Sequence, residues 1–258
     1  MAKLTDRYFD AYSSQMLVDV DKEFGQLSQH DGSADRFRFY TAVSVMSSLR
    51  IEGEAMEIDS YLKHKLQNVD YLPNLTEKPN DLFAAYEFAR DHRLNLRHFL
   101  EAHRIATQHL LTENQRGAVR TGNMIIIDQQ THRVQYEAPL ATEVQREFEG
   151  FWAELEQLLA QKWSQKHLFY FASLVRLVFV KIHPFNDGNG RMARLLEKWF
   201  LASFLGEKAW LIGSEHYYYK NLADYYHHLA RVGLFYDALD YGQSIPFLCM
   251  LPNALVKD

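Results

Sequence analysis

The sequence contains little cysteine and no long apolar run. Cys249 is the only cysteine among 258 residues, which excludes an internal disulfide and favours a reducing compartment. The longest apolar stretch, residues 168–180, is interrupted by Arg176 and is too short to span a bilayer. Residues 1–7 lack the apolar core of a secretory signal. These features predict a cytoplasmic protein that does not act at a membrane.

The sequence also lacks a strong excess of either charge. A formal net charge of −5 provides no general attraction to nucleic acid, so nucleic acid is not expected as a partner. Hydrophobic residues make up 47% of the chain, which is typical of one large globular domain, with or without a small appendage. Most segments place apolar residues at helical spacing, so the predicted fold class is mainly α.

The most informative segment is residues 183–194, with the sequence HPFNDGNGRMAR. Gly188 and Gly190 allow the backbone to turn sharply and to approach a ligand closely. A helix is predicted from Gly190 to about residue 205, and its first N–H groups would favour an anion. Arg191 and Arg194 share one face of the first turn. Two cations are unfavourable beside the positive end of the helix dipole unless an anion lies between them. This part of the segment predicts an anion site.

The same segment contains a candidate metal ligand and a candidate base. Asp187 precedes the glycines, and Mg²⁺ commonly takes one or two carboxylates beside substrate phosphates. His183 follows a predicted helix over residues 168–182, and Pro184 disfavours the α conformation at His183, so the imidazole should face the anion loop. Its ordinary pKa of about 6.5 suits proton acceptance at neutral pH. Each feature is common as a turn or a cap, but their combination predicts a polyphosphate site with a base.

Residues 183–194 resemble the Fic-family signature H-P-F-x-[D/E]-G-N-G-R-x-x-R, with every defined position filled. The resemblance implies a Fic-type helical bundle with one β-hairpin flap beside the active site. It also implies an enzyme that depends on Mg²⁺ and ATP and transfers AMP to a Tyr, Thr or Ser hydroxyl of a target protein. The kinase-like branch of the family has G-N-K where this chain has G-N-G, so kinase activity ranks low. The implied roles are a base at His183, a Mg²⁺ ligand at Asp187, a phosphate cradle at Gly188, Asn189 and Gly190, and holders of the β- and γ-phosphates at Arg191 and Arg194.

Residues 48–53, with the sequence SLRIEG, resemble the family's inhibitory motif, [S/T]-x-x-x-E-[G/N]. A helix is predicted over residues 37–52, which places Ser48 and Glu52 on one face. The resemblance implies that Glu52 pairs with Arg194 in the place of the γ-phosphate. We therefore expect an N-terminal helical region over residues 1–80 that carries the inhibitory helix, and a Fic catalytic core over residues 81–258. The best candidate for a linker is residues 72–81, which contain two prolines.

Residues 119–128 and 133–139 are apolar and β-branched on either side of a turn-like segment at 129–132, which predicts one β-hairpin. The family resemblance makes this hairpin a flap whose exposed edge docks the target protein through β-augmentation. The alternative is a hairpin that only packs on the helices. The predicted docking residues are Met124, Ile125, Ile126 and Ile127.

Residues 225–229, YYHHL, resemble the Y-Y-x-x-L element that lines the nucleotide pocket of the family. Tyr225 or Tyr226 could stack on adenine. Aromatic residues at helical spacing also occur in protein cores, and residues 217–219 form a competing tyrosine cluster. The sequence leaves both readings open.

Two other functions fit the same motifs. The enzyme could remove AMP from a modified protein, with Glu52 positioning a water molecule. Alternatively, the chain could be a nucleotide-sensing module that forms no covalent product and does not depend on His183. The sequence names neither the target protein nor the signal that releases Glu52. Self-association that buries the Glu52 helix would be a natural means of control.

Overall fold

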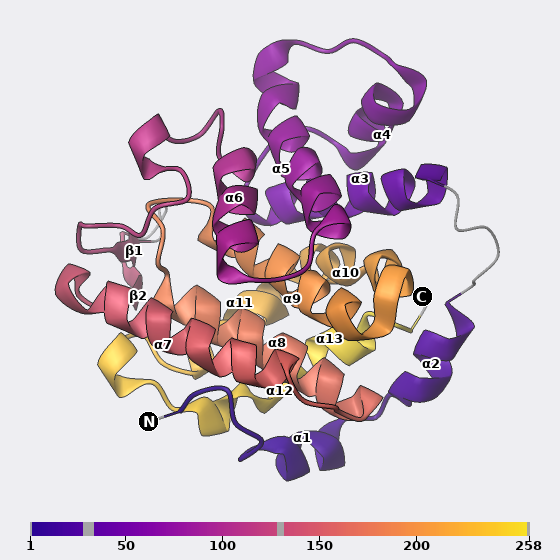
Figure 1. Ribbon diagram of the computed structural model, residues 1–258. Coiled ribbons are helices and arrows are strands. Elements are labelled where there is room, and N and C mark those ends of the chain that lie inside the picture. The colour runs from indigo at the N-terminus through magenta and orange to yellow at the C-terminus, as the bar shows by residue number, and fades with distance from the viewer. Residues whose placement is uncertain (1, 28–33, 128–131, 257–258) are drawn as a thin grey trace.

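The computed structural model describes residues 2–27, 34–127 and 132–256 (Figure 1). Over these ranges the chain is mainly helical with one two-stranded antiparallel hairpin, which confirms the predicted fold class. None of the described helices combines the length and the apolar character that crossing a bilayer requires. The helices are α1 (Phe9–Gln15), α2 (Val20–Gln26), α3 (Ala34–Ile51), α4 (Ile58–Gln67), α5 (Pro73–Asp91), α6 (Leu96–Ala106), α7 (Ala141–Leu159), α8 (Gln165–Ile182), α9 (Asn189–Leu205), α10 (Ser214–Lys220), α11 (Leu222–Arg231), α12 (Ile245–Leu248) and α13 (Met250–Asn253). Short 3-10 turns are η1 (Glu113–Gln115), η2 (Gly206–Leu211), η3 (Tyr236–Ala238) and η4 (Tyr241–Ser244).

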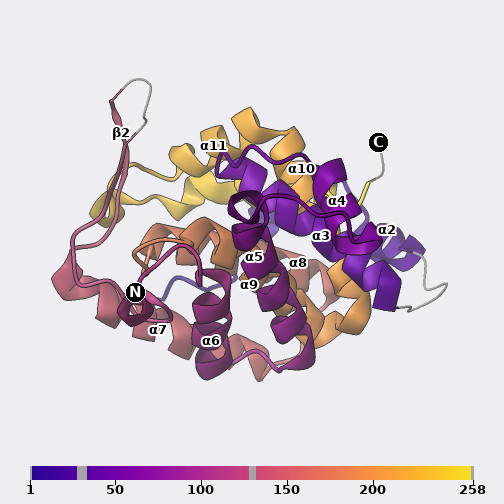
Figure 2. The same ribbon diagram turned by 90° about the horizontal axis from the view of Figure 1, so that it is seen from above.

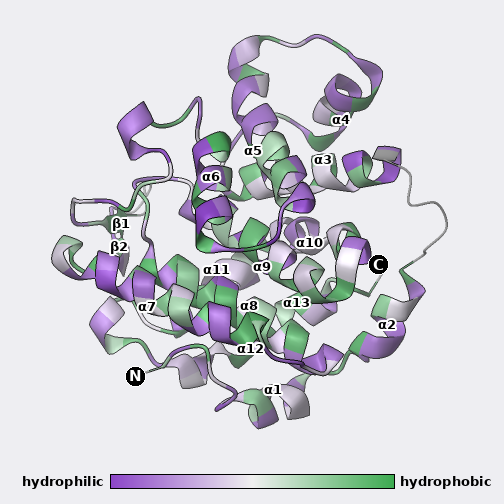
Figure 3. Cartoon of the chain, viewed as in Figure 1, coloured by the Kyte–Doolittle hydropathy of each residue, from purple (hydrophilic) through white to green (hydrophobic). Residues whose placement is uncertain are grey.

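Helix α8 lies at the centre of the bundle because it is apolar on all sides. Every residue from Leu168 to Ile182 is buried, and the Ser164 side chain caps the helix by accepting a hydrogen bond from the backbone N–H of His167. Helices α7 and α9 pack along α8 (Figures 1 and 2). Colouring by hydropathy shows the apolar residues concentrated on these inner helices, whereas the peripheral α4 is largely polar (Figure 3). The loop of residues 183–188 joins the end of α8 to the start of α9, so it lies at one end of this central pair.

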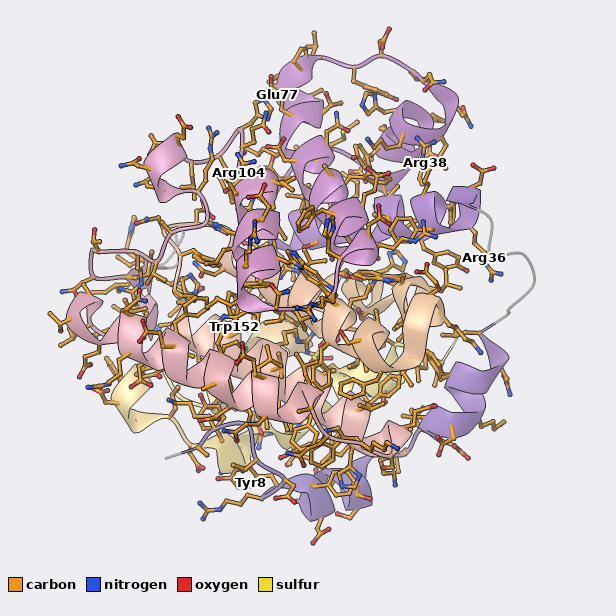
Figure 4. The ribbon with its side chains drawn as sticks, in the orientation of Figure 1. Tyr8, Arg36, Arg38, Glu77, Arg104 and Trp152 are labelled. Atoms are coloured by element: carbon orange, nitrogen blue, oxygen red, sulfur yellow. The ribbon has the colours of Figure 1, made fainter. Side chains whose placement is uncertain are left out.

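Helices α3, α5 and α6 form a second group that lies against α9 (Figure 2). Figure 4 shows Glu77 of α5 and Arg38 of α3 at the outer edge of this group, whereas Trp152 of α7 points toward α6. The Trp152 ring is buried and contacts the ring of Phe99 on α6 with centroids 5.2 Å apart. Aromatic packing therefore joins this group to the helices around α8.

The predicted linker over residues 72–81 is wrong, because these residues begin helix α5. Pro73 occupies the first turn, where a missing N–H removes no helical hydrogen bond. Pro79 lies inside the helix, which tertiary packing tolerates because Pro79 and Leu82 are buried. The expected division between residues 80 and 81 therefore falls within a continuous helix.

The hairpin consists of β1 (Ile125–Ile127) and β2 (Val134–Glu137), which are shorter than the two predicted strands. Ile126 pairs with Tyr136, and the register shifts between Ile126 and Ile127. Side chains alternate across the strand, so Ile125 and Ile127 are about half exposed, at 51% and 52%. The predicted turn at residues 129–132 lies mostly outside the described residues. Figure 2 shows the hairpin extending along one side of the helical body.

Candidate active site

His183 stands at the exit of α8 in the left-handed conformation, with φ 51° and ψ 57°. Its backbone N–H still donates to the carbonyl of Phe179, which closes the last helical turn. The Nδ1–H donates to the carbonyl of Val180 at 3.0 Å, which leaves Nε2 as the basic nitrogen. Burial lowers the pKa of the His183 imidazole, although the Glu52 and Asp187 carboxylates act to raise it. His183 is therefore a neutral, oriented base at neutral pH.

The loop after His183 is shaped by Gly188 and by the side chain of Asn189. Gly188 has φ +81°, and a Cβ there would lie 3.0 Å from Cγ2 of Thr107, so both the conformation and the space require glycine. The Asn189 amide accepts from the Phe185 N–H at 2.9 Å and donates to the Phe185 carbonyl at 2.8 Å. Asn189 therefore holds the loop with its side chain, while the first N–H groups of α9 have no carbonyl within the helix to bind.

Arg191 and Asp187 form an ion pair at the start of α9. Nη2 of Arg191 donates to Oδ1 of Asp187 at 2.8 Å, and the Gly188 N–H donates to the same oxygen. Half of the Asp187 side chain is exposed, whereas Nε of Arg191 is buried without an acceptor among the described residues. A buried guanidinium N–H without an acceptor fits a ligand that supplies anionic oxygens.

Arg194 is bound on three sides by α3 and its continuation. Its Nε donates to Oγ of Ser48 at 2.7 Å, and its Nη2 donates to the Ser48 carbonyl at 3.0 Å and to Oε1 of Glu52 at 2.6 Å. The Arg194 side chain is buried, whereas about a third of the Glu52 side chain is exposed. The structure thus contains the Glu52–Arg194 contact that the sequence resemblance implied.

Glu52 also marks where the charged groups converge. Burial acts to raise the pKa of Glu52, but the charges of Arg194, Arg191 and His183 together hold it below its ordinary value. The carboxylate lies against Gly190, where a Cβ would overlap Oε1. An anion therefore already lies at the α9 N-terminus, between both arginines and within electrostatic range of His183.

Part of the chain is similar to a known protein family. Residues 93–201 match the Fic/DOC family, a range that includes α8, the loop and most of α9. This part of the chain is similar to Fic/DOC domains. Fic domains are generally transferases that move nucleotide-derived groups onto proteins. The chain gave no significant match among curated proteins.

Solved structures share the fold at low sequence identity. A Fic family protein from Desulfovibrio desulfuricans is 23% identical, with a TM-score of 0.74 over 92% of this chain and 70% of that one. A Fic-domain signaling protein from Bacteroides thetaiotaomicron is 16% identical, with a TM-score of 0.69 over 92% of both chains. A Fic-1 fragment from C. elegans is 19% identical, with a TM-score of 0.63 over 97% of this chain and 72% of that one. Because these similarities reach well beyond residues 93–201, the flanking helices belong to the shared fold.

A cavity of about 350 Å³ adjoins His183. It lies between the hairpin, the end of α8 and α11, and its lining includes Ile126, Tyr226, Leu229 and Leu234. Tyr226 donates through its hydroxyl to the Ile51 carbonyl at 3.0 Å and remains 43% exposed. Tyr225 instead lies in the core, with 2% of its surface exposed. Of the two tyrosines named for stacking, the structure thus places Tyr226 in the cavity wall and Tyr225 in the core, because adjacent side chains on a helix point in different directions.

Arg120 is a site residue that sequence reasoning missed. Its Nε donates to the His183 carbonyl at 2.8 Å, and its Nη1 and Nη2 donate to the carbonyls of Gly122 and Pro139, each at 2.7 Å. Its backbone N–H also donates to the Pro184 carbonyl. One guanidinium thus ties both ends of the hairpin to the loop of residues 183–188. No spacing pattern in the sequence signals this role, because every acceptor is a backbone carbonyl.

His103 supports the loop from the opposite side. Its Nε2–H donates to the Asp187 carbonyl at 3.0 Å, its Nδ1 accepts from the Gly117 N–H at 2.8 Å, and its ring stacks on Phe185. Burial lowers the pKa of His103 to about 4, so the ring stays neutral in this tautomer. The residue therefore holds the Asp187 carbonyl in place.

Proposed function

We propose that the protein is an adenylyltransferase that moves AMP from ATP to a Tyr, Thr or Ser hydroxyl of a target protein and of itself. In this proposal Glu52 restrains the activity. The observation that carries it is the Glu52 carboxylate on Arg194 at the start of α9, within electrostatic range of His183. A base beside a filled anion site is the arrangement expected of a phosphate-transfer site held inactive by its own carboxylate.

The proposed chemistry needs one proton acceptor and a stabilised leaving group. Nε2 of His183 takes the proton from the target hydroxyl because Nδ1 is already committed to Val180. The hydroxyl oxygen then forms a bond to the α-phosphorus. The bond from that phosphorus to the α,β-bridging oxygen breaks, and its electron pair leaves with pyrophosphate.

The start of α9 provides the charge stabilisation in this scheme. The N–H groups of the first turn and the guanidinium groups of Arg191 and Arg194 would hold the β- and γ-phosphates. Asp187 would hold Mg²⁺, because Arg191 and the Gly188 N–H use only its Oδ1 and half of the side chain is exposed. The bound ion supplies neutralisation of the phosphate charge.

The hairpin and the cavity provide the remaining binding surfaces. A purine would fit the cavity beside His183, with a face on Tyr226 and Leu229. The exposed side chains of Ile125 and Ile127 would contact an extended segment of the target protein, paired with β1. Among the described residues, β1 pairs only with β2, so its other edge offers backbone groups.

Restraint follows from competition for Arg194. A γ-phosphate and the Glu52 carboxylate require the same guanidinium, and two anions cannot share that site without strong repulsion. Ser48 holds the guanidinium in the orientation that Glu52 uses. ATP would therefore bind with its phosphates displaced from the geometry for transfer.

Removal of AMP is the second candidate function, and one observation favours it. The Glu52 carboxylate is ionised, about a third exposed and close to the catalytic loop, so it could orient a water molecule toward a phosphodiester. Loss of the adduct from a modified target, measured by intact mass, should then require Glu52. Retention of the adduct would favour the transferase alone.

Incubation with ATP labelled at the α-phosphate tests the main proposal. We expect Glu52→Gly to increase label incorporation into the protein itself, and His183→Ala in the same background to abolish it. Glu54→Gly is the matched control, because Glu54 lies on the same turn but pairs with Lys78 instead of Arg194. Equal labelling of all four proteins, including the parent, would refute the roles of both His183 and Glu52.

A further inference from the structure

Lys181 is a buried cation in the wall of the cavity beside His183. It lies two residues before His183 in the last turn of α8, and only 3% of its surface is exposed. Its Nζ donates to the Gly233 carbonyl at 2.9 Å and lies 4.3 Å from the centroid of the Tyr136 ring. Lys181 and Tyr136 both line the cavity, as does Leu234, which follows Gly233.

The ammonium of Lys181 is incompletely satisfied. An ammonium has three N–H donors, and the Gly233 carbonyl accepts only one of them. In the described part of the chain no carboxylate compensates this charge, and burial alone lowers the pKa of Lys181 to about 8. A buried cation without a counter-charge is unfavourable unless another partner completes its hydrogen bonds.

The two tyrosine hydroxyls in the cavity wall are already committed. The Tyr136 hydroxyl donates to the carbonyl of Lys181, and the Tyr226 hydroxyl donates to the carbonyl of Ile51. Much of the rest of the wall is aliphatic, as at Ile126, Leu229 and Leu234. Such a wall fits the faces of a planar base but cannot distinguish one base from another. The unused donors of Lys181 are well placed to read the edge of a base.

We propose that Lys181 determines nucleotide specificity by donating a hydrogen bond to a ring nitrogen of the purine in this cavity. The inference rests on the proposed function, because it requires a nucleotide whose α-phosphate lies beside His183. A lysine donor matches an acceptor nitrogen on a purine edge. The triphosphate contacts at α9 and the base contact at Lys181 are then separate contributions to affinity.

A purely structural role is the competing explanation. Lys181 lies near the carboxyl end of α11, where a cation favourably contacts unpaired carbonyls. Lys208 offers a matched control for this role, because its Nζ donates to the Gly25 carbonyl at 2.8 Å and lies 5.0 Å from the Phe24 ring centroid. Lys208 is remote from the cavity lining, so it shares the contact pattern without the ligand.

The experiment measures binding of ATP and of inorganic tripolyphosphate by calorimetry in the Glu52→Gly protein. We expect Lys181→Met to weaken ATP binding by about tenfold or more, the usual effect of losing a hydrogen bond to a charged group. Tripolyphosphate binding should not change, because it has no base. Lys208→Met should bind both ligands normally. Equal weakening of ATP and tripolyphosphate, or unchanged ATP binding, would overturn the proposal.

A second series does not depend on whether Lys181→Met folds. In the protein that keeps Lys181, one of 1-deaza-, 3-deaza- and 7-deaza-ATP should bind about tenfold more weakly than ATP. If all three bind as well as ATP, the protein donates no hydrogen bond to a ring nitrogen and the inference is wrong. Failure of α-phosphate labelling together with a clear deaza effect would instead refute the transfer chemistry and leave the base contact standing.

Discussion

At the scale of single residues, the reactivity of His183 depends on the backbone that carries it. The left-handed conformation places the imidazole outside α8, and Pro184 prevents the helix from continuing. The Val180 carbonyl fixes the tautomer, and Arg120 holds the His183 carbonyl. Pro184 therefore helps to set the position of the titratable ring.

This environment predicts a pH dependence for AMP transfer. Burial lowers the pKa of His183 below its ordinary value of about 6.5, so the ring is neutral and basic at pH 7. Protonation removes the base, so the rate should fall as the pH decreases through the lowered pKa. In the Glu52→Gly protein the pH profile of the labelling rate should be flat above pH 7, with an acidic limb centred below about 6.5. A limb centred above that value would contradict the assignment.

The roles of individual site residues could be predicted where these residues are contiguous in the sequence. Residues 183–194 contain the base, the carboxylate and both arginines in one short segment, so the sequence alone indicated their association. Arg120, His103 and Lys181 act through backbone carbonyls or backbone N–H groups of other segments. Any residue type offers such groups, so the sequence contains no pattern from which these contacts could be predicted.

At the scale of elements, α3 and α9 are joined by polar contacts spaced one helical turn apart. Ser44 accepts from Nζ of Lys198 at 2.8 Å, and one turn later Ser48 accepts from Arg194. Glu52 follows after one more turn. This spacing of four residues brings each group to the same face of α3, so the position of Glu52 is linked to the packing of the whole helix.

Removal of one partner from the buried Lys198–Glu215 ion pair, which joins α9 to α10, should strongly destabilise the protein. The paired atoms lie 2.7 Å apart, and both side chains are almost fully buried. Lys198→Met leaves the Glu215 carboxylate buried without its cation, so we expect the free energy of unfolding to fall by about 3–5 kcal/mol in urea denaturation. Lys63→Met removes the exposed pair with Asp59 and should cost less than about 1 kcal/mol. Similar losses in the two variants would contradict this account.

The elements themselves were predicted unevenly. Helices α8 and α9 follow from apolar spacing and from the glycines at positions 188 and 206, which the structure places at the N-cap of α9 and just after its end. The start of α5 was misread as a linker because proline usually interrupts a helix. Burial of Thr76, Pro79 and Leu82 against neighbouring helices overrides that preference. Sequence patterns report local preference, and α5 is held by contacts with distant segments.

At the scale of the whole molecule, residues far apart in the sequence meet over the start of α9. The α3 segment brings Glu52 to Arg194 across 142 positions of sequence, and Tyr226 of α11 binds the Ile51 carbonyl beside it. The anion site, the cavity and the end of α3 are therefore neighbours. Occupancy of the cavity and the position of Glu52 should influence each other, since Tyr226 lines the cavity and its hydroxyl donates to the carbonyl of Ile51, the residue before Glu52.

Ligand-induced stabilisation tests this competition in the intact chain. A ligand that binds only the folded state adds about 2.7 kcal/mol at one hundred times its dissociation constant, which raises the melting temperature by several degrees. ATP with Mg²⁺ should stabilise the Glu52→Gly protein more strongly than the parent, because the parent must first displace its own carboxylate from Arg194. The measured quantity is the shift caused by nucleotide in each protein, since the substitution alone also changes stability. Glu54→Gly should behave like the parent, and an equal shift in all three proteins would show that Glu52 does not compete with the nucleotide.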